Sequence, residues 1–235
     1  MNTHVMIDIE TLSTRADAAI ASIGAVVFEP SATPPESFEQ EFYQTIDLQS
    51  SMDSGGRVDG DTISWWMRQS EEARRPLMKC GVRLAKALQE LTEFLAPFED
   101  LWLWSYGANF DGVILREAYA RLCMEAPWTY RQEMCFRTLI RVAPPELNAR
   151  PEGPHTPHNA LSDARQQASL CAPMLYWAGG LSTTNKEQQS RLNELSSRDI
   201  DTLASEDSEL MDECVGCNLD TGPQPECPAC CAFCG

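Results

Sequence analysis

Two acidic residues interrupt the apolar segment VMIDIETL at residues 5–12. Asp8 and Glu10 stand two positions apart among valine, methionine and isoleucine residues, which predict a buried strand. Their side chains would point to the same face, and burying unpaired charges is costly. An edge strand with a solvated face would avoid that cost. A divalent cation would offset it, because Mg²⁺ and Mn²⁺ prefer carboxylate oxygens, and the flanking apolar residues favour this interpretation.

A centre with two divalent cations usually needs further carboxylates. Asp111 follows a predicted strand at 101–105 and a turn that contains Gly107 and Asn109, and it opens a helix predicted over about 110–123. Sites in open α/β sheets lie at the carboxyl ends of strands, which is where this order places Asp111. An acid that only stabilises the helix dipole is the alternative.

The segment HNALSDARQQA at 158–168 supplies another carboxylate and an imidazole. Asn159 is a candidate N-cap, and Asp163 lies in the first turns of the helix that follows. His158 precedes this helix in a proline-rich loop, and an unperturbed imidazole pKa of about 6.5 suits proton transfer. A surface histidine is the alternative, as expected for the neighbouring His155.

The segments IDIET (7–11), GANFD (107–111) and HNALSDA (158–164) together resemble the DEDDh family of 3′→5′ exonucleases. The stretch TISWWMRQSEEAR (62–74) is similar to a compact stand-alone branch of that family found in phages and mycobacteria, some of whose members are exoribonucleases. The resemblance covers about residues 1–178. It implies an α/β domain with a ribonuclease H-like mixed sheet flanked by helices.

The resemblance also implies a mechanism with two Mg²⁺ or Mn²⁺ ions. Asp8 would bridge both ions, while Glu10 and Asp163 would complete the site of the ion that carries the nucleophilic water. Asp111 would hold the second ion, and His158 would act as general base. Hydrolysis of the terminal phosphodiester would release nucleoside 5′-monophosphates from the 3′ end of single-stranded nucleic acid, with RNA and DNA both open.

Five further residues are expected to bind substrate. In relatives, the position of Thr11 and Leu12 meets the 3′-terminal nucleotide, through backbone groups at the sugar and an apolar side chain at the base. Trp65, Trp66 and Phe110 are candidates for stacking on bases. Adjacent residues on a helix face different directions, so one of the two tryptophans is expected to belong to the core.

The charge of the chain limits how it can bind a polyanion. The net charge is −17, whereas a protein that binds phosphates by electrostatics alone should be basic. A nucleic-acid partner must therefore be held by metal ions, stacking and local arginines. Arg137, Arg141 and Arg165 lie close in sequence to the site segments, although surface salt bridges are the more common role of such side chains.

The remaining elements follow from periodicity and turn residues. Strands are predicted at 5–9, 20–28 and 38–46, a loop at 47–60, a helix from the N-cap Asp61 interrupted at Pro76, helices at 80–96 and 159–176, and a strand or helix at 134–140. Gly179 and Gly180 are expected to break the last helix. This order favours one α/β domain over residues 1–178.

A small Cys-rich appendage is predicted at the C-terminus, residues 214–235, after an acidic polar linker at 179–213. Two C-x2-C pairs favour a structural Zn²⁺ site over a tail of reactive thiols, and such a module would recruit a protein partner. The first choice of ligands is Cys214, Cys217, Cys227 and Cys230, with Cys231 or Cys234 as substitutes for the last. Cys80, Cys123, Cys135 and Cys171 are expected to be buried free thiols.

No apolar run is long enough to span a membrane, and the segment after Met1 does not resemble a secretory signal. A soluble cytoplasmic protein is therefore expected. A catalytically silent module that binds nucleic acid or recruits partners through the Cys-rich tail is the alternative function. The presence of all five motif residues argues against it.

Overall fold

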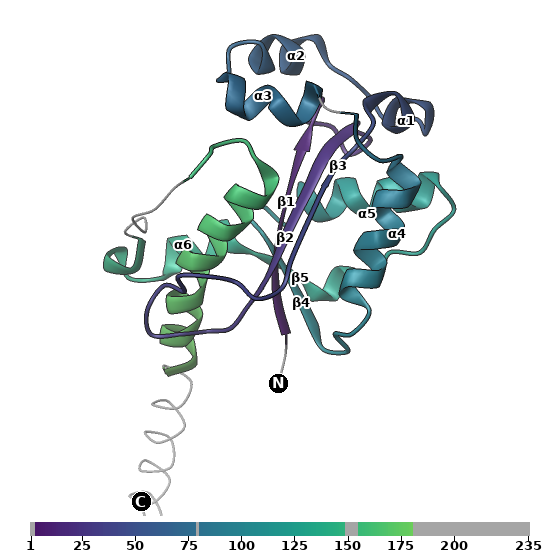
Figure 1. The fold of residues 1–235 in the computed structure, drawn as a ribbon. Helices are drawn as coiled ribbons and strands as arrows, with labels where there is room; N and C mark the ends of the chain where they lie inside the picture. The colour runs from purple at the N-terminus through teal and green to yellow at the C-terminus, as the bar shows by residue number, and fades with distance from the viewer. Residues whose placement is uncertain (1–2, 79, 149–154, 181–235) are drawn as a thin grey trace, which may run out of the picture. The chain divides into compact units, whose positions relative to one another are not determined.

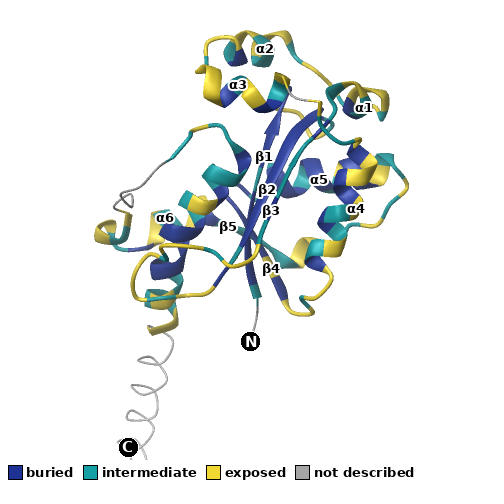
Figure 2. Cartoon of the chain, in the orientation of Figure 1, coloured by how far each residue is buried: buried dark blue, intermediate teal, exposed yellow. Residues whose placement is uncertain are grey.

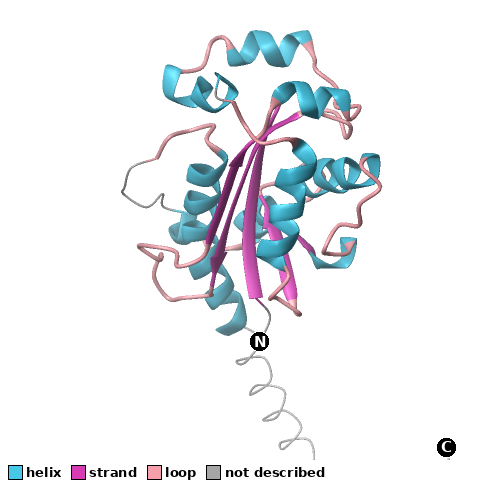
Figure 3. Cartoon of the chain, turned by 45° about the vertical axis from the view of Figure 1, so that its right-hand side comes forward, coloured by secondary structure: helices cyan, strands magenta, loops and turns pink. Residues whose placement is uncertain are grey.

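The computed structural model describes residues 3–78, 80–148 and 155–180, which belong to one compact unit from Met1 to Gly180. Its strands are β1 (Thr3–Thr11), β2 (Ile20–Phe28), β3 (Glu41–Thr45), β4 (Leu101–Ser105) and β5 (Glu133–Cys135). Its helices are α1 (Leu48–Asp53), α2 (Gly60–Trp66), α3 (Glu71–Met78), α4 (Leu84–Leu95), α5 (Asp111–Arg121), α6 (Phe136–Val142) and a helix over 160–180, with 3-10 turns at Tyr130–Gln132 and Pro145–Asn148. Figure 3 shows the strands at the centre with helices around them, and the predicted α/β class is confirmed.

The sheet is mixed and has the strand order β3-β2-β1-β4-β5. The central strand β1 runs antiparallel to β2 and parallel to β4. In Figure 1, α4 and α5 lie on one side of the sheet, and α6 and the green helix 160–180 lie on the other. The mixed sheet flanked by helices is therefore confirmed.

Alternation along β1 assigns its acidic residues to one face. Val5 and Ile7 are fully buried and belong to the core cluster that contains α4 and α5. Met6 is also fully buried, but it packs in the cluster formed with helix 160–180. Because side chains alternate along a strand, Asp8 and Glu10 share the face of Met6. Figure 2 shows that β1 is almost entirely buried, so these acids lie on a strand with little exposure to solvent.

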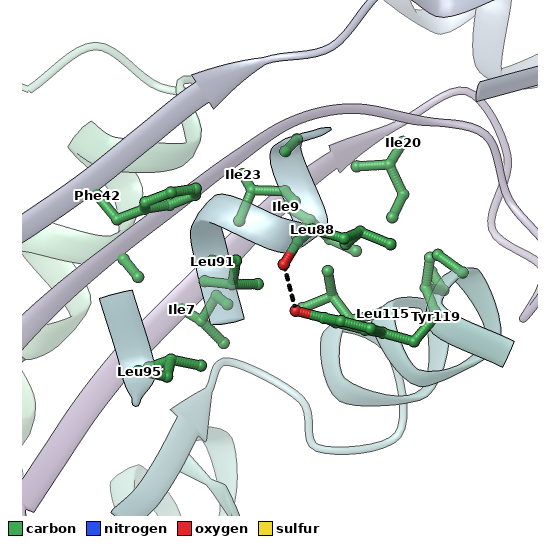
Figure 4. Packing of buried hydrophobic residues seen from close by; sticks show 14 of the residues in the cluster. Ile7, Ile9, Ile20, Ile23, Phe42, Leu88, Leu91, Leu95, Leu115 and Tyr119 are labelled. Atoms are coloured by element: carbon green, nitrogen blue, oxygen red, sulfur yellow. Dashed lines mark hydrogen bonds between the residues drawn. The ribbon is translucent and has the colours of Figure 1, made fainter. Parts of the chain in front are cut away.

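The opposite face of β1 forms the main hydrophobic core. Ile7 packs there with Leu88 and Leu91 of α4 and with Leu115 of α5, as Figure 4 shows. The hydroxyl of Tyr119 donates a hydrogen bond of 2.8 Å to the carbonyl oxygen of Leu88, so even the polar atom of this buried ring has a partner. This core fixes β1, β4 and α5 relative to one another and thereby supports the acids on the other face.

Two predicted elements differ from the structure near α1 and α2. The loop predicted at 47–60 contains α1, whose N-cap is Asp47; its carboxylate accepts a hydrogen bond of 2.6 Å from the amide of Ser50. The polar and glycine-rich composition of this segment predicts a loop, whereas the capping contact of Asp47 stabilises a short helix. The next helix begins at Gly60, with Asp59 rather than Asp61 in the N-cap position.

Proline and glycine residues that were expected to interrupt helices lie within helices at two places. Pro76 lies inside α3 and is buried, so packing offsets the single backbone hydrogen bond that the ring removes. Gly179 and Gly180 do not end the last helix, which continues through both residues. A helical glycine costs only about 1 kcal/mol relative to alanine, which a long packed helix tolerates.

Candidate active site

The four predicted carboxylates converge beside the C-terminal end of β1. Asp8 and Glu10 come from β1, Asp111 from the first residue of α5, and Asp163 from the first turn of helix 160–180. All four line one pocket of about 560 Å³, together with His158. Residues more than 150 positions apart in the sequence thus share one site, as the DEDDh pattern requires.

The position of Asp111 depends on the unequal lengths of β1 and β4. The parallel pairing between these strands ends at Met6 and Trp104, so the backbone of β1 continues beyond its neighbour. The amide of Ile9 then donates a hydrogen bond of 3.2 Å to Oδ1 of Asp111. One carboxylate oxygen of Asp111 is thereby fixed against the strand that carries Asp8 and Glu10.

Asp163 is positioned by the N-terminus of its own helix. The side chain of Asn159 accepts a hydrogen bond of 3.1 Å from the amide of Ser162, which confirms the predicted N-cap. The amide of His158 donates a bond of 2.8 Å to Oδ2 of Asp163. His158 adopts a φ of 62°, a left-handed conformation that non-glycine residues seldom occupy. The turn therefore holds the imidazole and the carboxylate together.

Gly24 allows this helix to approach the sheet. It pairs with Asp8 across β1 and β2, and a Cβ atom built on it would lie 2.3 Å from backbone atoms of Ala160 and Leu161. Backbone atoms at a helix start cannot move aside as a flexible side chain could. The absence of a side chain at Gly24 is thus what brings Asp163 within reach of Asp8.

We expect Gly24→Ala to lower the free energy of unfolding by about 1–3 kcal/mol, the usual cost of overpacking, and to weaken Mn²⁺ binding because Asp163 is displaced. Chemical denaturation and isothermal titration calorimetry measure the two effects. Gly179→Ala is the matched control, since its new Cβ would meet no atom within 4 Å. Unchanged Mn²⁺ affinity in the Gly24→Ala protein would contradict this role.

Burial raises the pKa values of Asp8, Glu10 and Asp111, and repulsion from neighbouring acids adds to the shifts of Asp8 and Glu10. Burial, and then the charges of Asp163 and Asp111, raise the pKa of Glu10 to about 8. Burial raises the pKa of Asp111 to about 7, although the bond from Ile9 opposes the shift. Asp8 has a pKa well above its usual range for the same two reasons, first burial and then its three acidic neighbours. The raised pKa values show that the ionised forms of Asp8, Glu10 and Asp111 are poorly stabilised by the protein groups around them.

These pKa values imply a stability that falls with rising pH when no metal is bound. Between about pH 4.5 and pH 8, Glu10 is protonated in the folded chain and ionised in the unfolded chain, so unfolding releases protons. Below that window both states are protonated, and the difference vanishes. In EDTA, the free energy of unfolding should therefore fall by on the order of a few kcal/mol from pH 5 to pH 8, and the melting temperature should fall with it.

Calorimetry of the EDTA-treated protein across this pH range tests the expectation. Saturating Mg²⁺ or Mn²⁺ should raise the melting temperature more at pH 8 than at pH 5, because the cation binds the ionised carboxylates. Glu10→Gln should flatten the pH dependence in EDTA. A melting temperature that stays constant or rises between pH 5 and pH 8 would contradict the arrangement.

The donor set fits a hard divalent cation. Among the residues that the structure describes, Glu10, His158 and Asp163 each offer one ligand atom, and these atoms lie within 4.8 Å of one another. Glu10 is only 8 % exposed and Asp111 only 4 %, so water solvates their charged forms poorly. Several carboxylate oxygens around one small volume are the ligands that Mg²⁺ and Mn²⁺ take.

His155 was expected to be an ordinary surface histidine, and that expectation is wrong. Its Nε2 lies 2.7 Å from Oδ1 of Asp163, and its side chain is only 21 % exposed. The other histidine, His158, directs its ring towards Trp65, with the ring centroids 4.7 Å apart. Both imidazoles therefore flank Asp163, and sequence spacing alone identified only one of them.

Gln167 is a second residue that the motif does not contain. Its Nε2 donates a hydrogen bond of 2.8 Å to Oδ1 of Asp8. Gln167 lies four residues after Asp163 on the same helix, so both side chains face the site. That spacing is the signal from which Gln167 could have been predicted.

Four of the five expected substrate residues occupy a second pocket of about 690 Å³ beside the carboxylates, whereas Leu12 lines neither pocket. Thr11, Trp65, Trp66 and Phe110 line it. Trp66 is only 3 % exposed and its indole nitrogen donates a bond of 2.9 Å to the carbonyl oxygen of Thr11, so it is the tryptophan that belongs to the core. Leu12 is buried in the same cluster as Trp66, and Trp65 remains partly exposed.

The cysteine predictions have different outcomes. Cys214, Cys217, Cys227 and Cys230 lie outside the described residues, as do the linker and the rest of the tail. The other four are free thiols, but Cys80 and Cys123 are exposed, and only Cys171 is buried. The sequence overestimated their burial because both exposed thiols lie outside the helices, after α3 and after α5.

No helix within the described residues is long and apolar enough to cross a membrane.

Comparison with known proteins finds nucleases of similar sequence and fold. An exodeoxyribonuclease of Enterobacteria phage T4 is 27% identical over 119 aligned residues, and the match covers 47% of this chain and 52% of the phage protein. The chain therefore spans about half the length of that relative.

Solved structures share the fold at low identity. Escherichia coli exonuclease I in complex with a dT13 oligonucleotide matches with a TM-score of 0.51 and 15% identity, over 74% of this chain and 41% of that one. Cell-death related nuclease 4 matches with a TM-score of 0.50 and 10% identity, over 74% and 64% of the two chains. These matches confirm the ribonuclease H-like exonuclease fold.

A family model covers nearly all of the unit that contains the site. It is described as the 3'-5' exoribonuclease Rv2179c-like domain, and it matches residues 3–175. The matched range includes the carboxylates on β1, on α5 and on helix 160–180, as well as both histidines. The chain therefore belongs to the family of 3'-5' exoribonuclease Rv2179c-like domains.

Proposed function

We propose that this chain is a Mg²⁺- or Mn²⁺-dependent exonuclease that removes nucleoside 5′-monophosphates from the 3′ ends of single-stranded nucleic acid. The observation that carries the proposal is the convergence of Asp8, Glu10, Asp111 and Asp163 with His158 in one pocket. Membership of an exoribonuclease family supports it.

The carboxylates would hold two cations. Asp8 lies close enough to Asp111, Glu10 and Asp163 to interact with the charge of each, which suits a ligand shared between two ions. Glu10 and Asp163 lie together beside His158, and Asp111 approaches from α5. When bound, two such ions polarise the scissile phosphate and lower the pKa of the attacking water.

His158 would take the proton of that water. A ring nitrogen lies within 4.8 Å of ligand atoms of Glu10 and Asp163, so the imidazole borders the place of attack. Contact with Trp65 and the bond from its amide to Asp163 restrict where the ring can move. His155, on the other carboxylate oxygen, would orient Asp163.

The pocket lined by Thr11, Trp65 and Phe110 would receive the 3′-terminal nucleotide. Of the two tryptophans that line this pocket, Trp65 is the less buried, and stacking on a base is worth about 1–3 kcal/mol. The family is described by its exoribonucleases, and the phage relative is an exodeoxyribonuclease, so both sugars require testing.

The direct test uses 5′-labelled single-stranded RNA and DNA with Mg²⁺, Mn²⁺ or EDTA. A metal-dependent ladder of shortened, 5′-labelled products is expected, with nucleoside 5′-monophosphates released. Failure to shorten either substrate under conditions in which exonuclease I works would reject the enzyme and favour the silent binding module. All five motif residues are present in the chain, which argues against that module.

A structural Zn²⁺ in the tail is a separate proposal that rests on the spacing of Cys214, Cys217, Cys227 and Cys230. Such a module would serve contacts with a protein partner rather than catalysis. Metal analysis of freshly reduced, full-length protein should find about one Zn²⁺ per chain. A zinc content near zero would remove the proposal without affecting the exonuclease.

A further inference from the structure

The two pockets adjoin across the carboxylate cluster. Both are lined by Ile9, Glu10 and Phe110, so they form neighbouring parts of one depression. The pocket with Trp65 lies on one side of Glu10. The side chains of Tyr106 and Arg137 line the other pocket, and nothing in the motif assigns them a role.

Tyr106, just after β4, lies beside Arg137 at the start of α6. The guanidinium carbon of Arg137 lies 5.9 Å from the centroid of the Tyr106 ring, and its Nη2 donates a hydrogen bond of 3.2 Å to Oδ1 of Asn109. The Tyr106 ring packs edge-on against the buried Phe136, with the centroids 6.3 Å apart. The ring is therefore held firmly while 48 % of Tyr106 remains exposed.

Gly107 leaves the space that the guanidinium occupies. A Cβ atom at this position would lie 3.0 Å from Nη2 of Arg137. The backbone amide of Arg137 also donates a bond of 3.0 Å to the carbonyl oxygen of Tyr106, which fixes α6 against the end of β4. The cation thus borders the carboxylate pocket because the local backbone places it there.

The charge of Arg137 is available to a ligand. Neither pocket contains another lysine or arginine among its lining residues. Within the described part of the chain, Arg137 forms no salt bridge, whereas Arg165 is paired with Glu41 and Arg116 with Glu133. A half-exposed tyrosine ring next to a guanidinium without a salt-bridge partner is a combination that can bind a base and its phosphate.

We infer that Tyr106 and Arg137 bind the nucleotide on the 5′ side of the scissile bond, the base on the Tyr106 ring and its phosphate at Arg137. This inference rests on the proposed exonuclease function and adds a direction to it. The strand would enter over Tyr106, pass the carboxylates at the scissile phosphate and end at Trp65. The cation at this point would add to the metal ions and the stacking that hold a polyanion on a chain of charge −17.

Two substrates distinguish an effect on this subsite from an effect on the hydrolysis step. A single-stranded pentanucleotide occupies it, whereas the p-nitrophenyl ester of a nucleoside 5′-monophosphate offers a terminal nucleotide with no nucleotide on the 5′ side. Arg137→Met and Tyr106→Ala should each lower kcat/KM for the pentanucleotide about 10–100-fold more than for the ester. Arg137→Met should also reduce the salt dependence of pentanucleotide binding by about one phosphate contact.

Arg141→Met is the matched control, because Arg141 is exposed one turn further along α6 and lines neither pocket. Equal losses on both substrates, or no loss in either variant, would overturn the subsite. If the wild type hydrolysed neither substrate, the proposed function would fail instead. Binding of labelled pentanucleotide in Ca²⁺ would then decide the inference: a loss in Arg137→Met but not in Arg141→Met supports it, and equal affinities overturn it.

Discussion

Replacing Asp8 by asparagine should lower exonuclease activity by about 10³-fold or more. Removing a group that only orients a metal ligand typically lowers metal affinity or activity about 10–100-fold. Asp8 is itself the ligand proposed to bind both ions, so a larger loss is expected. The asparagine side chain keeps the size of aspartate and can still accept the hydrogen bond from Gln167. The loss would therefore report the missing charge rather than a missing shape.

Thermal unfolding provides the second readout for this variant. Burial and three acidic neighbours hold the pKa of Asp8 well above its usual range, so removing its charge relieves repulsion in the metal-free protein. In EDTA at pH 8, the Asp8→Asn protein should melt higher than the wild type, and Mn²⁺ should stabilise it less. Asp53→Asn, on the exposed surface of α1, should change neither activity nor Mn²⁺ stabilisation. Retention of more than about a tenth of the activity in Asp8→Asn would reject the shared-ligand role.

The positions of the acids could be predicted because each has a local signal in the sequence. Asp8 and Glu10 lie within a strand whose apolar residues determine which face they share. Asp111 opens a helix after a strand and a short turn, and Asn159 caps the helix that carries Asp163, a contact the structure confirms. Local propensity and hydrophobic pattern agree at these points, so the sequence alone placed the residues on the correct elements.

Contacts between elements were not predictable in the same way. His155 reaches Asp163 through a proline-rich loop with no periodic pattern. Gly24 lies in the middle of β2, and its role becomes visible only when the helix start at Ala160 is known to touch it. Tyr106 and Arg137 meet across 31 sequence positions. A single sequence carries propensities along the chain, whereas these distances depend on how packed elements meet.

His158→Asn should lower kcat by about 10²–10⁴-fold, the range of general acid–base catalysis, while Mn²⁺ affinity changes little. Asparagine tolerates the left-handed conformation that His158 adopts at a φ of 62°, and its amide can still donate to Asp163. The variant therefore removes the imidazole without straining the turn. His158→Gly, which accepts the same φ without penalty, provides a second deletion of the ring.

His155→Asn is the informative comparison, because both histidines flank the same carboxylate. The imidazole of His155 contacts Oδ1 of Asp163, so its loss should weaken Mn²⁺ binding and affect kcat less than the loss of His158 does. Single-turnover rates at saturating Mn²⁺ and calorimetric Mn²⁺ titrations without substrate measure the two effects separately. If His155→Asn lost the rate and His158→Asn lost only the metal, the two roles would be reversed, and the proton would leave the attacking water on the opposite side of Asp163.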